Sequence, residues 1–419
     1  MKNWAGNFQY GAKEILAPRS LDELQSMVEG NARIRAIGSR HSFNNLADSQ
    51  EVLLTTEKLR KVIEIESSKS EVTVEGGIRY GDLAPIIDAA GFGLPNLASL
   101  PHISIAGAIA TATHGSGFKN QQLGSAVNEI EFVLPDGSLR TVSKELHPHE
   151  FYGSVVHLGS LGIISKLKLN LIPRFNISQR VYLDLPFGVA FDHFEEIMSS
   201  AYSVSLFTDW KDSRFTQVWK KELTVQDTSQ PTDSVYSAGQ AQLKVHPILG
   251  NSADKCTDQL GVPGPWYERL SHFKLEFTPS NGDELQSEYW IPVHDAVDAL
   301  KSLMDLQTAI APLLYISEIR AICKDSFWLS PAYEQDCIAI HFTWRQVWSE
   351  VRTLLPKIEE RLAPFQARPH WGKLFTMPLA KVAQLYPRIN EFRRLAEGLD
   401  PMGKFSNPYM DELLARNYS

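Results

Sequence analysis

One stretch of the sequence, residues 95–117 (PNLASLPHISIAGAIATATHGSG), consists largely of small side chains. Backbone can approach a ligand closely only where Cβ atoms do not intervene, and glycine gives the most freedom. Successive exposed N–H groups, aided by serine and threonine hydroxyls, can form a concavity for anionic oxygens such as those of a pyrophosphate. The alternative is a small-residue loop or helix packed in a core, so the interpretation depends on the rest of the chain.

The length and charge of the chain exclude several classes of protein. With 419 residues, the chain is long enough for two or three domains and for a large core without disulfide staples. The formal net charge of −8 argues against nucleic acid as a partner, because a basic surface is missing. We expect no membrane span, since no run of about 18 uncharged apolar residues occurs. The N-terminal MKNWAGNFQY also lacks the apolar segment of a secretory signal.

Cysteine and histidine spacing gives two further expectations. Cys256, Cys323 and Cys337 form no C-x-x-C motif, and an odd number of scattered cysteines is typical of reduced thiols in a cytoplasmic protein. His147 and His149 form a close pair without an evident third ligand, so we expect no metal site. The sequence also lacks the fingerprints of a Rossmann dinucleotide site, a P-loop and a G-x-S-x-G nucleophile elbow.

Hydrophobic periodicity in the first 175 residues or so indicates α+β structure. Alternating apolar residues predict strands, and a capping box at Ser20 and Glu23 predicts the start of a helix. The predicted elements are hairpins at 62–75 and 127–142, strands at 34–37, 52–55 and 163–172, and helices at 21–28 and 80–90.

After residue 176 the character of the sequence changes, and several predicted strands carry aromatic residues. The predicted strands are 180–185, 204–210, 217–219, 317–322 and 338–344, and the predicted helices are 194–202, 293–306 and 348–365. The polar, proline-containing segment 227–250 is predicted to be a long surface loop.

His41 lies at the apex of a tight loop that follows the strand 34–37, between Ser39 and Ser42. An imidazole presented in this way can act as an acid or base, as a metal ligand, or, when neutral, as a nucleophile. One such use is attack on the methyl position of an oxidised flavin, which gives a covalent histidyl link. The structural alternative is a histidine that only caps its loop.

Two predicted strands carry polar side chains on one face. Glu318 and Arg320 are two residues apart, as are His341 and Thr343, so each pair faces one way. Together they suit a ligand with several hydroxyls, because buried polar groups need partners. The alternative is an exposed face with an ordinary ion pair of little energetic value. Lys373, in the aromatic-flanked segment HWGK, is either a desolvated lysine with a lowered pKa or a surface lysine.

These segments together resemble a known family of enzymes. GSRHSF at 38–43, PNLASLPHISIAG at 95–107 and THGSG at 113–117 resemble the two FAD loops of the vanillyl-alcohol-oxidase (PCMH) type of FAD enzyme. Within that superfamily the chain resembles the alditol (xylitol) oxidases nearly end to end. The likeness includes NWAGN at 3–7, SVSLFTDW at 203–210, GVPGPW at 261–266, SEIR at 317–320, HFTW at 341–344 and RPHWGK at 368–373.

The resemblance implies an α+β fold with a two-lobed FAD-binding domain and a substrate domain whose antiparallel sheet lies over the flavin. It implies an FAD-binding domain at 1–175, a substrate-binding domain at 176–365, and a C-terminal segment, 366–419, that returns to the FAD domain. FAD is the implied cofactor, held covalently by an 8α-histidyl link through His41. The implied cofactor-binding residues are Ala36, Ile37, Gly38, Ser39, Arg40, His41, Ser42, Ser99, Ser104, Gly107, Ala108, Ile109, Ala110, Thr111, Ile163 and His370.

The resemblance also implies an activity. It implies that the primary C1 hydroxyl of a polyol such as xylitol or sorbitol is oxidised to the aldose by hydride transfer to flavin N5, with O2 reduced to H2O2. The implied polyol-binding residues are Ser99, Glu318, Arg320, His341, Thr343 and Lys373, of which Arg320 and Lys373 are catalytic. The expected partners are therefore a polyol and O2, with neither nucleic acid nor membrane, and we expect a monomer.

Two other functions compete with this expectation. One is an aldonolactone or sugar dehydrogenase of the same superfamily that uses an acceptor other than oxygen. The other is a flavin- or sugar-binding protein without catalysis. One departure from the family pattern is Arg40, where the relatives have a small residue. A cation beside His41 can contact a phosphate or can slow the attachment of the flavin.

Overall fold

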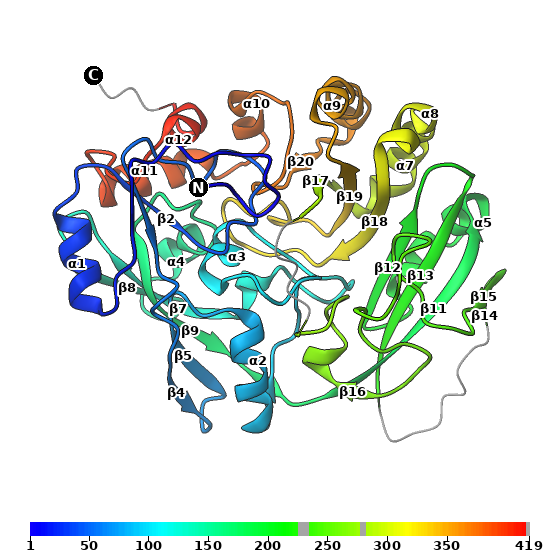
Figure 1. Ribbon diagram of the computed structural model, residues 1–419, viewed down its shortest axis with the longest axis horizontal. Helices are drawn as coiled ribbons and strands as arrows, with labels where there is room; N and C mark the ends of the chain where they lie inside the picture. The colour runs from blue at the N-terminus through cyan, green and yellow to red at the C-terminus, as the bar shows by residue number, and fades with distance from the viewer. Residues whose placement is uncertain (225–233, 277–281, 416–419) are drawn as a thin grey trace.

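The computed structural model describes residues 1–224, 234–276 and 282–415, and a five-stranded and a ten-stranded antiparallel sheet form its two halves (Figure 1). The five-stranded sheet consists, in spatial order, of β4 (Val62–Glu66), β5 (Glu71–Glu75), β9 (Ile163–Asn170), β7 (Val127–Val133) and β8 (Leu139–Ser143). The hairpins predicted at 62–75 and 127–142 are therefore confirmed. The predicted strand 163–172 is divided, because its end forms β10 (Ile172–Pro173), which pairs with β6 (Phe92–Gly93) instead.

A small parallel sheet and several helices complete this N-terminal half. The sheet consists of β1 (Glu14–Leu16), β3 (Val52–Thr55) and β2 (Ile34–Ile37), and the helical segments are α1 (Leu21–Glu29), α2 (Tyr80–Ala89), α3 (Ile105–Ala110), η1 (Leu123–Ala126) and α4 (Pro148–Ser154). The predicted cap of α1 forms, because Ser20 Oγ accepts a hydrogen bond from the Glu23 N–H at 3.2 Å. The reciprocal bond of a capping box does not form, since the Glu23 carboxylate accepts from the N–H of Arg19.

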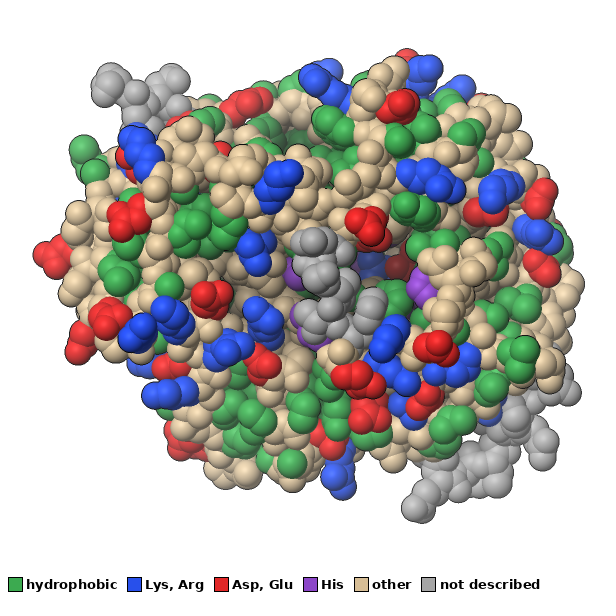
Figure 2. Space-filling view, in the orientation of Figure 1, with side chains coloured by type: hydrophobic (Ala, Val, Ile, Leu, Met, Phe, Trp, Pro, Cys, Tyr) green, Lys and Arg blue, Asp and Glu red, His purple; other side chains and the backbone are tan. Residues whose placement is uncertain are grey.

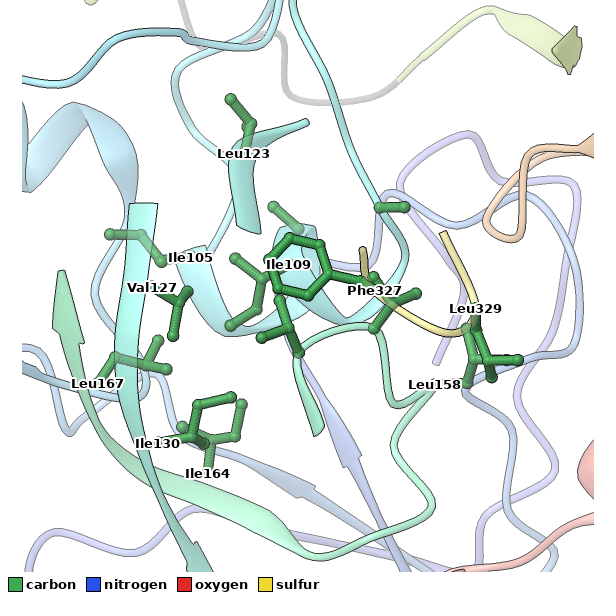
Figure 3. Packing of buried hydrophobic residues seen from close by; sticks show 14 of the residues in the cluster. Ile105, Ile109, Leu123, Val127, Ile130, Leu158, Ile164, Leu167, Phe327 and Leu329 are labelled. Carbon is green, nitrogen blue, oxygen red and sulfur yellow. The ribbon is translucent and has the colours of Figure 1, made fainter. Parts of the chain in front are cut away.

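The small-residue stretch has two sides. Its middle forms α3, from which Ile105 and Ile109 pack into the largest apolar cluster beside Val127 and Ile130 of β7 (Figure 3). Apolar burial of this kind contributes about 25 cal/mol per Å² removed from water. The two isoleucines therefore anchor α3 in the core, while Gly107 and Ala108 of the same helix also border the space on its other side.

The ten-stranded sheet forms the second half of the molecule. Its strands, in spatial order, are β14 (Ser234–Val235), β15 (Ala238–Gln240), β11 (Asn176–Pro186), β13 (Arg214–Leu223), β12 (Ser203–Thr208), β18 (Leu314–Ile322), β19 (Cys337–Arg345), β17 (Glu284–Pro292) and β20 (Arg368–Pro369), with β16 (Gly264–Pro265) paired to β11. The segment predicted as a loop at 227–250 therefore contributes two short strands, β14 and β15, while residues 225–233 lie outside the described part of the chain.

Helices cover one face of the ten-stranded sheet. They are α5 (Phe187–Asp192), α6 (Phe194–Ser199), α7 (Ala296–Met304), α8 (Gln307–Ile310) and α9 (Trp348–Leu362), with 3₁₀ turns η3 (Val293–Asp295), η4 (Ala311–Leu313) and η5 (Ala363–Phe365). The 3₁₀ turn η2 (Trp266–Glu268) packs instead in the apolar cluster of the N-terminal half. Ile319, Ile340 and Phe342 project from β18 and β19 into the apolar cluster beneath these helices. Because side chains alternate along a strand, their neighbours project from the opposite face, toward the N-terminal half.

The C-terminal segment packs against the N-terminal half (Figure 1). Its helices α10 (Leu379–Gln384), α11 (Ile389–Leu399) and α12 (Pro408–Leu413) bury Val382, Phe392 and Met410 in the same cluster as α3. The buried guanidinium of Arg35 on β2 donates to the carbonyl groups of Phe405 and Leu46, so the two ends of the chain share one core. No helix in the described ranges has the length and apolar content to cross a membrane.

Candidate active site

A cavity lies where the small-residue stretch meets the open face of the ten-stranded sheet. Its walls come from the loop 37–43, from the stretch 98–114, and from residues of β12, β17, β18 and β19. The cavity and the open space at its mouth measure about 1400 Å³. Figure 2 shows that this face of the molecule is hollowed near its centre and that histidine side chains gather around the hollow.

The pairing register of β17, β19 and β18 places polar side chains next to one another on the floor of this cavity. Glu318 on β18 lies directly across from His341 on β19, and His341 lies across from Glu288 on β17. Arg320 and Thr343, each two residues further along its strand, project from the same face. Four of the predicted polyol-binding residues therefore come together on one buried surface.

His41 stands in the opposite wall. Its ring stacks on Trp4, with ring centroids 4.9 Å apart, and its Nδ1 atom is buried with no hydrogen-bond partner among the described residues. Burial lowers the pKa of His41 to about 4, so the imidazole is neutral near pH 7 and keeps a lone pair. Arg40 precedes it in a left-handed backbone conformation, with φ of 63°, which costs a non-glycine residue about 1 kcal/mol or more.

The loop of His41 is fastened to the loop of Lys373. The Phe43 N–H donates to the carbonyl of Gly372 at 2.8 Å. The Asn44 side chain donates to the carbonyl groups of Trp371 at 2.8 Å and Lys373 at 2.9 Å. These bonds join segments about 330 residues apart in sequence, and they fix the position of Lys373 relative to His41.

Glu318 is held as a carboxylate. Its Oε1 lies 2.7 Å from His272 Nε2, and its Oε2 lies 3.6 Å from Arg320 Nε. Burial by itself raises the pKa of Glu318, but the Arg320 guanidinium and His272 outweigh burial and lower that pKa below its usual range. Because a carboxylate only accepts, His272 Nε2 carries the hydrogen that Glu318 receives. The other nitrogen of the neutral ring, Nδ1, is then an acceptor, and it lies 3.3 Å from Lys221 Nζ.

Lys373 lies at the other end of the polar floor. Its Nζ is 2.6 Å from Glu288 Oε2 and 2.8 Å from His341 Nδ1. Burial lowers the pKa of Lys373, and the negative charge of Glu288 opposes part of that shift. Burial, with the positive charge of Lys373, lowers the pKa of His341 to about 4, so its ring is neutral near pH 7. Its other nitrogen, Nε2, lies 3.0 Å from Thr343 Oγ1.

Most of the predicted site residues reach the cavity. Those that line it are Ile37, Gly38, Ser39, Arg40, His41, Ser42, Ser99, Ser104, Gly107, Ala108, Thr111, Glu318, Arg320, His341, Thr343, His370 and Lys373. Four predicted cofactor-binding residues, Ala36, Ile109, Ala110 and Ile163, do not line it. The side chains of Ile109 and Ile163 are buried in apolar clusters, so they contribute to packing behind the cavity wall.

Sequence reasoning missed four residues of the polar network: Glu288, His114, His272 and Lys221. His114 lies within the small-residue stretch, and its Nε2 is 2.8 Å from Glu288 Oε1. The available signal for Glu288 is the alternation of Glu284, Gln286 and Glu288, which marks one polar face of β17. No comparable local signal marks His272 or Lys221, because their roles depend on contacts between distant segments.

Comparison with known proteins gives consistent matches. A family model described as an FAD binding domain matches residues 12–143, and one described as D-arabinono-1,4-lactone oxidase matches residues 281–413. An alditol oxidase of Streptomyces sp. is 44% identical over 416 residues, which cover 98% of this chain and 98% of the relative. An L-gulono-1,4-lactone dehydrogenase of Mycobacterium tuberculosis is 27% identical over 98% of each chain.

Solved structures share the fold. A solvent-stable cholesterol oxidase superposes with a TM-score of 0.78 at 17% identity, over 98% of this chain and 96% of that one. A chitooligosaccharide oxidase superposes with a TM-score of 0.77 at 11% identity, over 97% of this chain and 93% of that one. These likenesses confirm the predicted α+β fold of the vanillyl-alcohol-oxidase type.

The residues of the cavity fit an FAD cofactor. His41 Nδ1 and Ser104 Oγ are buried polar atoms that lack a hydrogen-bond partner in the described ranges, and both belong to residues of the cavity wall. A Cβ at Gly38 would overlap with Ser104 Oγ, so the absence of a side chain lets the His41 loop lie against the small-residue stretch. The small-residue stretch and the His41 loop thus face the cavity together, and the small side chains of the stretch allow the close contact that a large cofactor requires.

Proposed function

The chain belongs to the alditol oxidase family of FAD enzymes, and from this premise we propose that it oxidises the primary C1 hydroxyl of a polyol to the aldehyde of an aldose, with O2 as the electron acceptor. The observation that carries the proposal is the convergence of Glu318, Arg320, Thr343 and Lys373 on one floor, opposite the wall that holds His41. When bound, FAD supplies the acceptor for a hydride at its N5 atom and passes two electrons on to O2, which becomes H2O2. Residues 1–175 and 366–419 form the FAD-binding part in this proposal, and residues 176–365 form the substrate-binding part.

The polar floor orients the polyol. The Glu318 carboxylate can only accept hydrogen bonds, so it receives the hydrogen of a substrate hydroxyl. The Arg320 guanidinium can only donate, so it binds a substrate oxygen. A substrate without these hydroxyls leaves buried polar groups unpaired, which costs about 1–3 kcal/mol for each group. The arrangement therefore selects a polyhydroxylated chain and holds its C1 end in one position.

Lys373 accepts the proton of the C1 hydroxyl. Two acceptors, Glu288 Oε2 and His341 Nδ1, engage two positions around its Nζ atom. In the neutral amine, the remaining lone pair is free for the hydroxyl proton, and burial favours that neutral form by lowering the pKa of Lys373. As the O–H bond breaks and the C–H pair leaves as hydride, the new ammonium and Arg320 stabilise the negative charge that develops on oxygen.

We further propose that His41 holds the flavin covalently through its 8α-methyl group. A neutral, buried imidazole with a free nitrogen is a competent nucleophile, and its stacking on Trp4 limits the orientation of the ring. Arg40 lies beside this position and lines the cavity, so its guanidinium can contact a cofactor phosphate. A cytoplasmic location also remains our proposal, and the three cysteines are free thiols, as reduced surroundings favour.

The experiment is to mix the purified flavoprotein with xylitol, sorbitol and glycerol and to measure peroxide release and anaerobic flavin bleaching. We expect both with at least one polyol. Flavin bleaching without peroxide release in air, together with turnover of an artificial electron acceptor, would instead indicate a dehydrogenase. Because one relative, 27% identical, is a lactone dehydrogenase, aldonolactones are tested as substrates in the same way. If no polyol or lactone bleaches the flavin, the proposed oxidation is refuted.

A further inference from the structure

One buried carboxylate stands behind the cavity floor and contacts several of the residues that line it. Glu288 does not itself line the cavity. Its Oε2 lies 2.6 Å from Lys373 Nζ and 3.2 Å from Arg320 Nη2, and its Oε1 lies 2.8 Å from His114 Nε2. The indole N–H of Trp290 donates to Oε1 at 3.0 Å. The Glu288 side chain has no exposed surface, so these protein groups take the place of the water molecules that would solvate an exposed carboxylate.

We propose that Glu288 is a positioning residue for the polyol reaction, which sets the place and the hydrogen-bond direction of Lys373 and Arg320 without touching the substrate. This inference rests on the proposed function for its catalytic meaning. Both proposed catalytic residues share the single oxygen Oε2. A shift of that oxygen would therefore move the proton acceptor and the alkoxide-stabilising guanidinium together.

A chain of hydrogen bonds through Lys373, His341 and Thr343 connects Glu288 to the cavity. When Lys373 is an ammonium it can only donate, so it donates to Glu288 Oε2 and to His341 Nδ1, two atoms that are themselves 3.1 Å apart. Because Nδ1 accepts, the single hydrogen of the neutral His341 ring lies on Nε2 and is donated to Thr343 Oγ1. Thr343 must then direct its own hydrogen elsewhere. As it lines the cavity, we infer that it donates to a substrate oxygen.

The negative charge of Glu288 also acts on the pKa of Lys373. The titratable and charged groups that act on Lys373 are Glu288 and Glu284 on β17, Glu318 and Arg320 on β18, His341 on β19, His114 of the small-residue stretch and His370 of its own loop. Among them, Glu288 is the carboxylate in direct contact, and an opposite charge at such a distance shifts a pKa by about 1–3 units. Removing the charge of Glu288 therefore moves the titration of Lys373 to lower pH.

The test is Glu288→Gln, an isosteric change that removes the charge and replaces one acceptor oxygen with an NH2 donor. We expect kcat/KM for xylitol to fall about 100-fold or more, because a positioned acid–base group contributes about 10²–10⁴. We also expect the titration of Lys373 to move down by about 1–3 units. That titration is read without turnover, from the pH dependence of Lys373 acetylation by acetic anhydride, measured by mass spectrometry of the purified holoenzyme.

A matched control separates positioning from packing. Glu359 on α9 is also buried, and it accepts from Tyr289, the neighbour of Glu288 on the opposite face of β17. Glu359→Gln should lower the unfolding temperature while it leaves the Lys373 titration in place. An unshifted Lys373 titration in Glu288→Gln overturns the inference, even if the variant is less stable.

The conservative change Glu288→Asp covers the case in which Glu288→Gln does not fold. It keeps the charge but shortens the side chain by one methylene, so we expect a lower kcat/KM with the Lys373 titration within about half a unit of the parent. Parental kcat/KM in this variant also overturns the inference. A parent protein that oxidises no polyol would refute the proposed function instead, and the acetylation measurement would still decide whether Glu288 controls Lys373.

Discussion

The substitution Lys373→Arg separates the two roles proposed for Lys373, proton acceptor and positive charge. Lys373→Arg keeps a positive charge beside Glu288 but cannot accept a proton, since the pKa of a guanidinium exceeds about 12. Lys373→Met removes the charge as well. If Lys373 takes the hydroxyl proton, both variants lose the proton acceptor and should reduce flavin about 10²–10⁴-fold more slowly than the parent. If Lys373 acted only through its charge, the arginine variant would keep most of the rate.

The free energy of unfolding should differ between the same two variants. Lys373→Met leaves the fully buried Glu288 without its 2.6 Å partner, and loss of one member of a buried ion pair costs about 3–5 kcal/mol. We expect about 3 kcal/mol, because Arg320, His114 and Trp290 remain on the carboxylate. With an unfolding entropy of about 2.1 cal/mol/K per residue over 419 residues, this lowers Tm by about 3 °C. Lys373→Arg should lose less.

The assay is anaerobic stopped-flow reduction of the flavin by saturating xylitol, with thermal unfolding of the same samples followed by fluorescence. Intact flavin absorbance shows that each variant retains its cofactor. A Lys373→Arg rate within tenfold of the parent would refute proton transfer to Lys373. A Lys373→Met variant as stable as the parent would refute the assignment of a buried, energetically coupled pair to Lys373 and Glu288.

Three further outcomes are expected. His41→Ala should release its flavin into the supernatant after acid precipitation while the parent keeps colour in the pellet, and a colourless parent pellet contradicts covalent attachment through His41. Ser99→Ala should lower kcat/KM for xylitol about tenfold, the value of one hydrogen bond of about 1.4 kcal/mol, with flavin absorbance unchanged, whereas loss of flavin would assign Ser99 to the cofactor side. The rate of flavin reduction should rise with pH and then level off, because the neutral form of Lys373 is the active one. The midpoint should lie below the ordinary lysine pKa of 10.5, since burial lowers the pKa of Lys373. Stopped-flow reduction rates that fall as pH rises would contradict this.

Local sequence patterns predicted the parts of the site that lie on regular strands. The strands at 317–322 and 338–344 are confirmed within β18 and β19, because alternating polar and apolar residues mark a sheet with one buried apolar face. That alternation also placed Glu318, Arg320, His341 and Thr343 on their shared face. The residues of the His41 loop and the small-residue stretch were identified through the family resemblance, since composition alone left a packed loop as an alternative.

The parts that escaped prediction depend on contacts between distant segments. Glu288 becomes important only because β17 pairs with β19 in a register that sets it across from His341, and no local pattern specifies that register. Lys221 and His272 are separated by 51 residues and meet behind Glu318, so their roles follow from the fold. The short strands β14 and β15 were predicted as loop because their few residues are too short a run for periodicity to detect.

The pairing register of β17, β19 and β18 determines both the packing of the apolar core and the alignment of the polar residues in the cavity. Glu288, His341 and Glu318 form one row across three strands. Adjacent residues of these strands, Tyr289, Ile319, Ile340 and Phe342, pack in the apolar core on the other face. A slip of one residue in β19 would turn Phe342 toward the cavity and His341 into that core. Such a molecule loses apolar burial and gains unpaired polar groups, so it is disfavoured before any substrate arrives. Misregistered chains are thus removed by instability, and the molecules that survive folding carry an aligned set of reactive groups.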